Sequence, residues 1–128
     1  MKPIIRRTTV IIAACVLISI VTIAQTSNFT RVKFPRGRTT AILKGTLSPD
    51  MPRHYALKAR AGQTMTVHLA SPGKNARFTI YPSGQAHPLE DAKDRLDWSG
   101  ELPDSGEYVI TVMPVRGRAS YTLEVTIR

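Results

Sequence analysis

From residue 25 onward, hydrophobic and polar residues alternate in short runs. In residues 64–70, Met65, Val67 and Leu69 share one side of the segment, and polar residues occupy the other. A period of two is typical of a β-strand with one buried face. Comparable runs, bounded by Gly, Pro, Ser or Asn, occupy residues 29–34, 39–47, 54–59, 76–81, 96–102, 108–112 and 121–127. This part of the chain is therefore expected to form strands joined by turns.

The number and spacing of these runs favour one fold class. Seven or eight short strands with frequent turn signals are typical of an antiparallel β-sandwich of the Greek-key or jelly-roll kind. No segment after residue 25 keeps hydrophobic residues at helical spacing for three turns. We therefore predict an all-β sandwich domain over residues 25–128. Residues 90–94 stay open as a turn, a helical turn or a loop.

The first 24 residues have a different pattern. Lys2, Arg6 and Arg7 precede a nearly unbroken apolar run over residues 10–24, which ends in Thr22-Ile23-Ala24. A positive start, an apolar middle and a small-x-small end are typical of a secretory signal peptide. We expect residues 1–24 to be a signal peptide cleaved after Ala24. The remaining residues would then be one periplasmic domain.

Two alternatives remain for this segment. Ile12-Ala13-Ala14-Cys15 fits the lipoprotein box of bacteria, although the apolar run continues well past Cys15. The other alternative is an uncleaved anchor, for which residues 8–24 are slightly short of the roughly 20 residues that a spanning helix needs. All three interpretations place the domain outside the cytosol. Cleavage after Ala24 would leave it free of the membrane.

Composition and charge narrow the range of functions. A chain of 128 residues is long enough for one domain, and one cysteine excludes an internal disulfide or a multi-cysteine zinc site. The formal net charge is +9, and removal of residues 1–24 lowers it to +6. Ten basic residues and one acid lie between Arg31 and Arg77, whereas seven acids and two bases lie between Glu90 and Glu107. Such polarity steers encounters with charged partners.

The sequence holds no arrangement typical of catalysis or cofactor binding. Its three histidines stand outside any catalytic motif, and no Gly-x-Ser-x-Gly elbow is present. Asp91, Asp94 and Asp97 lack the glycine-containing spacing of a calcium loop. Most aromatic residues, Trp98 among them, lie at core-facing positions, which argues against a nucleic-acid surface. We expect a non-enzymatic protein that uses no metal or cofactor and binds no nucleic acid.

The segment over residues 102–108 is suited to a rigid corner. Its sequence is Leu-Pro-Asp-Ser-Gly-Glu-Tyr, and it leads into a predicted strand. In Greek-key sandwiches, a tyrosine at such a position returns its hydroxyl to the upstream backbone of the same corner. We expect Tyr108 to do so. A rigid corner of this kind can also present Ser105 to a partner.

A second loop, over residues 113–119, carries two guanidinium groups. Arg116 and Arg118 flank Gly117 there. Arginine pairs bidentately with carboxylates, which lysine cannot do. The loop is therefore a candidate probe of an acidic active site. The alternative is a pair of solvated arginines beside a turn.

Several segments resemble a known family. They are Phe34-Pro35-Arg36-Gly37, Gly45-Thr46-Leu47, Tyr55-Ala56-Leu57-Lys58-Ala59, Ala61-Gly62-Gln63-Thr64-Met65-Thr66-Val67, Ser105-Gly106-Glu107-Tyr108-Val109-Ile110-Thr111-Val112 and Tyr121-Thr122-Leu123-Glu124-Val125. These segments are similar to the bacterial pre-peptidase C-terminal-like domains. Within that group, the chain resembles the periplasmic inhibitors of goose-type lysozyme, over about residues 32–127.

The resemblance implies a β-sandwich whose loops occupy the substrate cleft of a host muramidase. It implies that Ser105, Gly106 and Tyr108 shape one contact loop, similar to the Ser-Gly-x-x-Tyr loop of lysozyme inhibitors, with Tyr108 one residue earlier. Arg116 and Arg118 match the position of a basic loop in the goose-type inhibitors. His54 and Tyr55, which follow the turn at Pro52, are further contact candidates.

The function implied by the resemblance is non-enzymatic inhibition of a goose-type lysozyme from a host, which would be the protein partner. The alternative is an envelope module of the pre-peptidase type that binds a glycan or a protein.

Overall fold

The computed structural model describes residues 29–82 and 84–128, so the predicted signal peptide and Cys15 lie outside the described residues. Eight strands follow one another along this part of the chain. They are β1 (Phe29–Arg31), β2 (Thr40–Leu47), β3 (Arg53–Ala59), β4 (Thr64–Ala70), β5 (Ala76–Pro82), β6 (Asp97–Glu101), β7 (Gly106–Pro114) and β8 (Ala119–Ile127). A 3-10 turn, η1 (Pro72–Lys74), separates β4 from β5. No helix within this part has the length and hydrophobicity to cross a bilayer.

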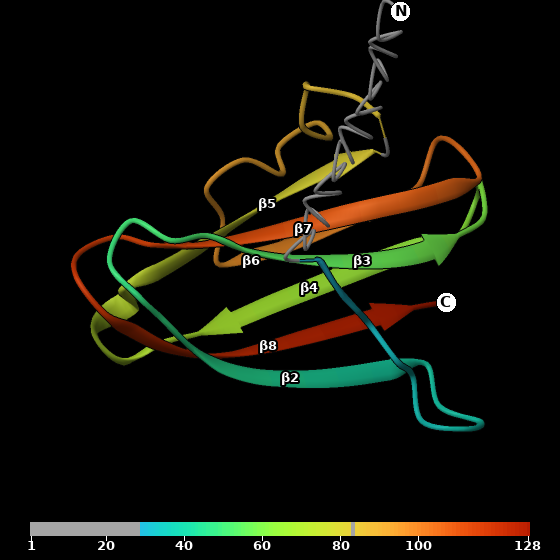
Figure 1. Cartoon of the computed structure of the whole chain (residues 1–128). Helices are drawn as coiled ribbons and strands as arrows, with labels where there is room; N and C mark the ends of the chain where they lie inside the picture. Colours follow the sequence, from blue (N-terminus) through green and yellow to red (C-terminus); the bar gives the residue numbers. More distant parts are fainter. Residues whose placement is uncertain (1–28, 83) are drawn as a thin grey trace, which may run out of the picture.

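The strands form two four-stranded sheets that pack face to face (Figure 1). One sheet has the order β1-β3-β7-β5, and the other has the order β2-β8-β4-β6. Neighbouring strands of both sheets are antiparallel, except that β1 and β3 are parallel. The predicted all-β antiparallel sandwich is confirmed, with one parallel pair at an edge.

The first predicted strand is shorter than the alternation suggested. β1 ends at Arg31, although the N–H of Val32 still donates to the carbonyl of Ala56 at 2.9 Å. Pro35 then has no N–H to offer, and its carbonyl accepts the N–H of Arg38 at 2.9 Å in a turn. The chain therefore leaves the first sheet here and enters the second as β2.

The core lies between the two sheets and follows the predicted alternation. In β4, Met65, Val67 and Leu69 are at most 2 % exposed, and the residues between them face solvent. The inward residues of the other strands, with Ala92 and Leu102 from loops, complete one continuous hydrophobic cluster. Because residues 29–128 contain no cysteine, the domain depends on this packing for its stability.

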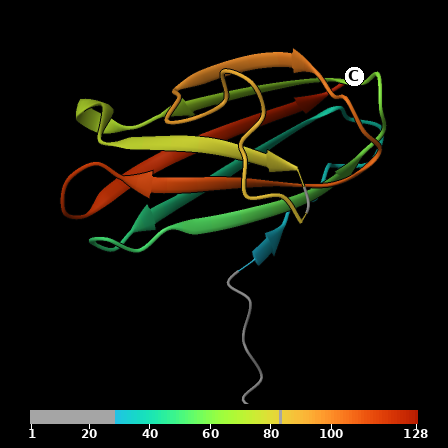
Figure 2. The same cartoon turned by 90° about the horizontal axis from the view of Figure 1, so that it is seen from above.

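The segment left open, residues 90–94, is a loop that covers the free edge of β5 (Figure 2). The N–H of Ile80 donates to the carbonyl of Ala92 at 3.0 Å, and the N–H of Phe78 donates to the carbonyl of Arg95 at 2.9 Å. Asp91 and Asp94 adopt left-handed backbone conformations, with φ of 58° and 52°. Aspartate tolerates this region better than most residues. The loop thus satisfies backbone groups of an edge strand that would otherwise be open to pairing.

Candidate functional site

The two predicted contact loops lie at opposite ends of the sandwich. Ser105 immediately precedes β7, and the loop with Arg116 and Arg118 immediately follows it. β7 has nine residues, which span about 26 Å at the usual rise of a strand. In Figure 1 the loop before β7 and the loop after it lie at the two ends of the orange arrow. The structure therefore does not bring the two loops together in one contact surface.

The corner around Ser105 is held by hydrogen bonds within the domain. The hydroxyl of Tyr108 donates to the carbonyl of Asp104 and accepts the N–H of the same residue at 3.2 Å. This confirms the predicted tyrosine corner. Ser105 is exposed, and its Oγ accepts the N–H of Ala61 at 2.9 Å. Gly106 is exposed too, with a φ of 148° that side-chain-bearing residues rarely adopt. Tyr108 is 1 % exposed and shapes the corner from below.

The loop with Arg116 and Arg118 is clamped by the side chain of Asn75. The Oδ1 of Asn75 accepts the N–H of Arg116 at 2.9 Å. Its Nδ2 donates to the carbonyls of Arg116 and Arg118, at 2.8 and 3.2 Å. The backbone carbonyl of Asn75 also accepts the N–H of Val115, at 2.8 Å. Four hydrogen bonds to one residue tie the loop to the rest of the domain, while both arginine side chains remain exposed.

Further basic and hydrophobic side chains surround this loop. Lys74 ends η1 next to Asn75, and it is exposed. Val115 is 53 % exposed, and Met51, in the neighbouring loop between β2 and β3, is 55 % exposed. We call this end of the sandwich, with Lys74, Met51, Val115, Arg116 and Arg118, the basic tip. Exposed hydrophobic residues next to arginines are typical of the surfaces that proteins use to bind one another.

Sequence reasoning did not identify Lys74, Asn75 or Met51 as parts of this surface. The segment over residues 71–75 looks like an ordinary loop in the sequence. Its importance depends on contacts with residues 41 to 43 positions away, to which no local motif points.

His54 and Tyr55, the two further contact candidates, differ in exposure. His54 lies on the outer face of its sheet, where Nδ1 is 2.9 Å from Oγ1 of Thr111 and the ring packs against Phe29 with centroids 5.1 Å apart. Tyr55 is 3 % exposed, and its hydroxyl is hydrogen-bonded to that of Tyr121. Tyr55 therefore offers no side-chain surface to a partner.

Tyr121, on β8, packs closely with Gly45 of β2 and with Arg53 and Tyr55 of β3. Burial raises the pKa of Tyr121 well above its ordinary value, and the hydrogen bond with Tyr55 raises it further. Gly45 faces this group, since a Cβ there would lie 2.6 Å from the hydroxyl of Tyr121 and 2.7 Å from Nη1 of Arg53. The absence of a side chain at residue 45 leaves room for the guanidinium and the phenol beside it.

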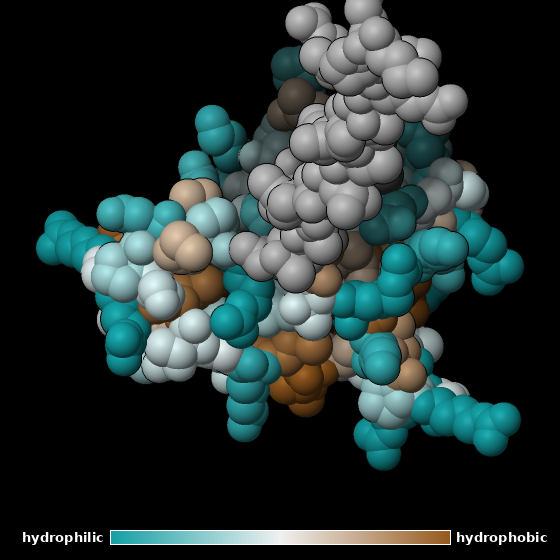
Figure 3. All heavy atoms as spheres, viewed as in Figure 1, coloured by the Kyte–Doolittle hydropathy of each residue, from teal (hydrophilic) through white to brown (hydrophobic). Residues whose placement is uncertain are grey.

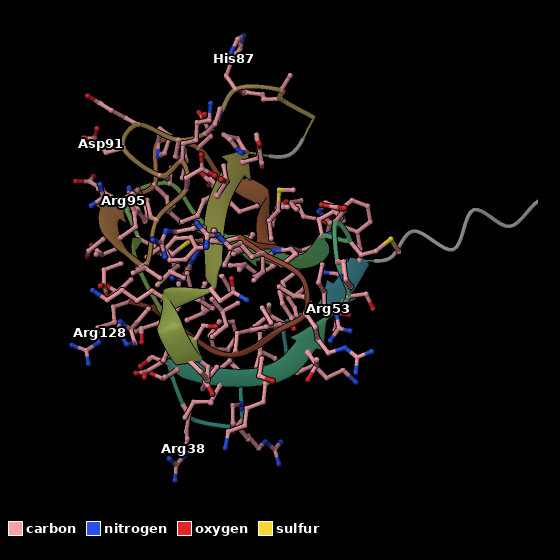
Figure 4. The ribbon with its side chains drawn as sticks, turned by 90° about the vertical axis from the view of Figure 1, so that its left-hand side faces the viewer. Arg38, Arg53, His87, Asp91, Arg95 and Arg128 are labelled. Atoms are coloured by element: carbon pink, nitrogen blue, oxygen red, sulfur yellow. The ribbon has the colours of Figure 1, made fainter. Side chains whose placement is uncertain are left out.

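The same Arg-Gly-Arg sequence occurs twice, at opposite ends of the domain. Residues 36–38 repeat the order of residues 116–118, and both central glycines have positive φ, 75° at Gly37 and 53° at Gly117. The first copy leads toward the start of β2, and Arg38 projects outward from it (Figure 4). Among the described hydrogen bonds, its backbone turn at Arg38 has no side-chain clamp comparable to Asn75. The two copies have equal charge but different backbone support.

The charge polarity of the sequence is only partly a polarity in space. Most basic residues of the segment 31–77 lie on or next to β1, β2 and β3 at one lateral side of the sandwich, but Lys74 and Arg77 lie on η1 and β5. The acidic segment forms β6 and its flanking loops at the other side. Figure 4 shows Asp91 on one side and Arg38 and Arg53 on the other. Figure 3 shows hydrophilic side chains around a hydrophobic area over β2, the strand in which Ile42 is 62 % exposed. Within the described residues, no three His, Cys, Asp or Glu side chains gather as a group that could hold a metal ion.

Solved structures of the same architecture include inhibitors of lysozyme. Aeromonas hydrophila PliG, a periplasmic lysozyme inhibitor of g-type lysozyme, is 30% identical, with a TM-score of 0.67, over 78% of this chain and 96% of that protein. Salmonella Typhimurium PliG, an inhibitor of the same kind, is 20% identical, with a TM-score of 0.60, over 78% of this chain and 97% of that one.

The fold is also similar to that of a domain from a different class of protein. The pre-peptidase C-terminal domain of a collagenase from Bacillus anthracis is 13% identical, with a TM-score of 0.55, over 78% of this chain and 94% of that domain. At that identity the likeness concerns the fold alone. No family model matches the sequence, and no curated protein matches it.

Proposed function

Because the chain belongs to the family of periplasmic inhibitors of g-type lysozyme, we propose that it is itself a non-enzymatic inhibitor of a g-type lysozyme and that the basic tip makes the decisive contact. The observation that carries this assignment is the loop of Arg116 and Arg118, which Asn75 holds rigidly at the end of the sandwich. The predicted signal peptide and the periplasmic location of the related inhibitors support export to the periplasm.

The chemistry of the target supports this role for arginine. Glycoside hydrolases of most kinds depend on carboxyl groups that flank the bond to be cleaved. A guanidinium group inserted beside such a carboxylate forms charge-assisted hydrogen bonds and occupies space that the sugar needs. In this proposal Arg116 or Arg118 reaches the carboxylate, and exposed Val115 and Met51 pack against the rim of the cleft.

Rigidity favours tight inhibition. A loop that is ordered before binding loses little conformational entropy when it docks. The clamp by Asn75 fixes the backbone on both sides of Gly117, so only the two arginine side chains need to be ordered on binding. The corner at Ser105 and Gly106 is a separate candidate contact. If the basic tip fills the cleft of the lysozyme, that corner lies about the length of β7 from the cleft.

An inhibition assay with matched variants tests the proposal. Purified protein is mixed with a g-type lysozyme, and lysis of a bacterial cell-wall suspension is followed by turbidity, with a chicken-type lysozyme in parallel. We expect near-stoichiometric inhibition of the g-type enzyme. The double variant Arg116→Ala with Arg118→Ala should weaken it by at least about tenfold, because charge-assisted contacts of arginine dominate such interfaces.

The second Arg-Gly-Arg sequence supplies the control. The double variant Arg36→Ala with Arg38→Ala removes the same charge from the same tripeptide at the other end of the domain. It should inhibit as well as the unmodified protein. Absence of any inhibition of the g-type enzyme contradicts the proposed function. Equal loss in both double variants contradicts the basic tip as the contact and points to net charge instead.

A further inference from the structure

A cleft of about 690 Å³ lies at the lateral side of the sandwich opposite the basic strands. It is bounded by β6, by the loop that precedes β6 and by Pro103. The half-buried side chains of Trp98 and Leu89 line it, and polar groups from neighbouring residues surround them. This volume lies within the range of about 300–1,000 Å³ that is typical of ligand pockets. The basic tip lies outside this cleft, and of the corner segment over residues 102–108 only Pro103 borders it.

Trp98 is held in a fixed orientation within the cleft. Its Nε1–H donates to the carbonyl of Glu90 at 3.0 Å. Its ring lies over Gly100, where an added Cβ would be 2.6 Å from Cζ2 of the indole. The sequence pattern placed Trp98 with the core-facing aromatics, but the structure leaves it half-buried, in contact with the core and with the cleft. An indole in this position presents aromatic surface to whatever enters.

The lining of the cleft is strongly acidic in a basic protein. It carries four carboxylates, from Glu90, Asp91, Asp97 and Glu101, against the single guanidinium of Arg95. Figure 4 shows Asp91 and Arg95 on the same side of the molecule. The side chain of Asp97 pairs with His68, and Nε of Arg95 donates to the carbonyl of Asp97 at 3.2 Å.

Three of these carboxylates are free to bind a cation. Within residues 29–82 and 84–128, no basic group forms an ion pair with Glu90, Asp91 or Glu101, and all three side chains are exposed. The chain as a whole has a net charge of +9, which repels polycations in general. A cation that binds here therefore does so because of the local arrangement and not because of the overall field.

From the cleft, the fixed indole and the local charge, we propose that this site binds a basic peptide segment of a protein partner through lysine or arginine side chains. A guanidinium or ammonium group over the face of an indole gains from cation–π attraction, and a guanidinium also stacks on it. The carboxylates at the rim then pair with the same or the next basic side chain. Among the residues that the structure describes, no other aromatic side chain lines this cleft, which makes Trp98 its main apolar anchor.

The site can act independently of the basic tip. Glu101 of β6 lies opposite Thr64, at the start of β4, in the register of the two strands. The basic tip lies beyond Ala70, at the other end of β4. A partner in the cleft would leave Arg116 and Arg118 uncovered. The protein would then have one basic surface for an acidic enzyme and one acidic cleft for a basic partner.

Trp98 is the only tryptophan of the chain, so its fluorescence reports on the cleft directly. The experiment titrates the purified protein with hexa-arginine and follows the emission of Trp98 at low and at high salt. We expect a saturable change in emission whose apparent affinity falls as salt screens the charges. The double variant Glu90→Gln with Glu101→Gln should bind at least about tenfold more weakly, because two charge-assisted contacts are lost.

A matched variant and a neutral ligand complete the test. Asp50→Asn with Glu124→Gln removes two exposed carboxylates outside the cleft and should leave the affinity unchanged. Both double variants replace exposed side chains, and their thermal unfolding should match that of the unmodified protein. No response to hexa-arginine, or equal weakening in both double variants, would overturn the proposal. A response to a neutral chito-oligosaccharide without one to hexa-arginine would also overturn it and assign the cleft to a glycan.

Discussion

The side-chain oxygen of Asn75 accepts the backbone N–H of Arg116 at 2.9 Å, across 41 positions of sequence. This contact joins the loop after β4 to the loop after β7, and it determines how the two arginines of the basic tip are presented. Removal of the side chain tests the importance of rigidity separately from that of charge. Asn75→Ala should weaken inhibition of a g-type lysozyme by about tenfold, because loop order must then be gained on binding. Inhibition constants from the lysis assay measure this.

The result for Asn75 is informative only if the domain stays folded. Asn75 is half-buried and outside the core cluster, so thermal unfolding should show only a modest loss of stability, on the order of 1 kcal/mol. Asn75→Asp retains the acceptor for Arg116 but loses both donated bonds, and it should inhibit at an intermediate level. An Asn75→Ala variant with unchanged inhibition would show that the hydrogen bonds of Asn75 do not contribute to inhibition.

Tyr108 stabilises the corner at Ser105 through its hydroxyl. Tyr108→Phe leaves the buried ring in place but removes both hydrogen bonds to the backbone of Asp104. We expect the free energy of unfolding to fall by about 1–3 kcal/mol, measured by urea denaturation, since backbone groups lose their partner. Inhibition by the folded variant should be unchanged, because the basic tip lies at the other end of β7. Loss of inhibition without loss of stability would contradict this separation.

Gly45 should tolerate no side chain. Gly45→Ala places a methyl group 2.6 Å from the hydroxyl of Tyr121, so the packed group around Arg53 must shift. Overpacking of this kind costs about 1–3 kcal/mol, which urea denaturation can detect. Thr46→Ala, an exposed change in the same strand, is the control and should alter stability by less than about 0.5 kcal/mol.

Stability should also fall at alkaline pH because of Tyr121. Its pKa in the folded state lies above the ordinary value of 10.0, mainly through burial. The folded protein therefore holds this proton more tightly than the unfolded chain does. The corresponding stability is complete below pH 10.0 and is lost as pH rises toward the folded-state pKa.

The slope is at most about 1.4 kcal/mol per pH unit for one such group. Urea unfolding of the unmodified protein and of Tyr121→Phe, between about pH 9 and about pH 11, measures it. The variant should lose this part of the slope. Identical slopes in both proteins would assign the alkaline instability to other groups.

Local patterns predicted the fold well but not the arrangement of the site. Alternation such as that of Met65, Val67 and Leu69 marks a strand with one buried face, and the structure confirms it. The corner at Tyr108 was predictable too, because its hydroxyl reaches only four residues back. Contacts of this range are encoded by neighbouring residues, which a sequence displays directly.

Long-range contacts explain what the sequence did not reveal. The hydrogen bond between Asn75 and Arg116 joins residues 41 positions apart, and that between Tyr55 and Tyr121 joins residues 66 positions apart. No local motif can predict contacts of this range. Trp98 follows the alternation of an inward residue, but β6 is an edge strand, and part of an inward side chain at an edge remains open. The positions of the two predicted loops at opposite ends likewise depend on the course of β7, which local sequence patterns do not show.

The last strand of the chain occupies the middle of its sheet. β8 lies between β2 and β4, and Thr40 contacts Thr126 across 86 positions. A chain that emerges with its N-terminus first therefore cannot close this sheet until the nine residues of β8 are available. Such a topology makes this sheet depend on contacts between segments far apart in the sequence, and it delays completion of the sheet until β8 is available to pair with both neighbours.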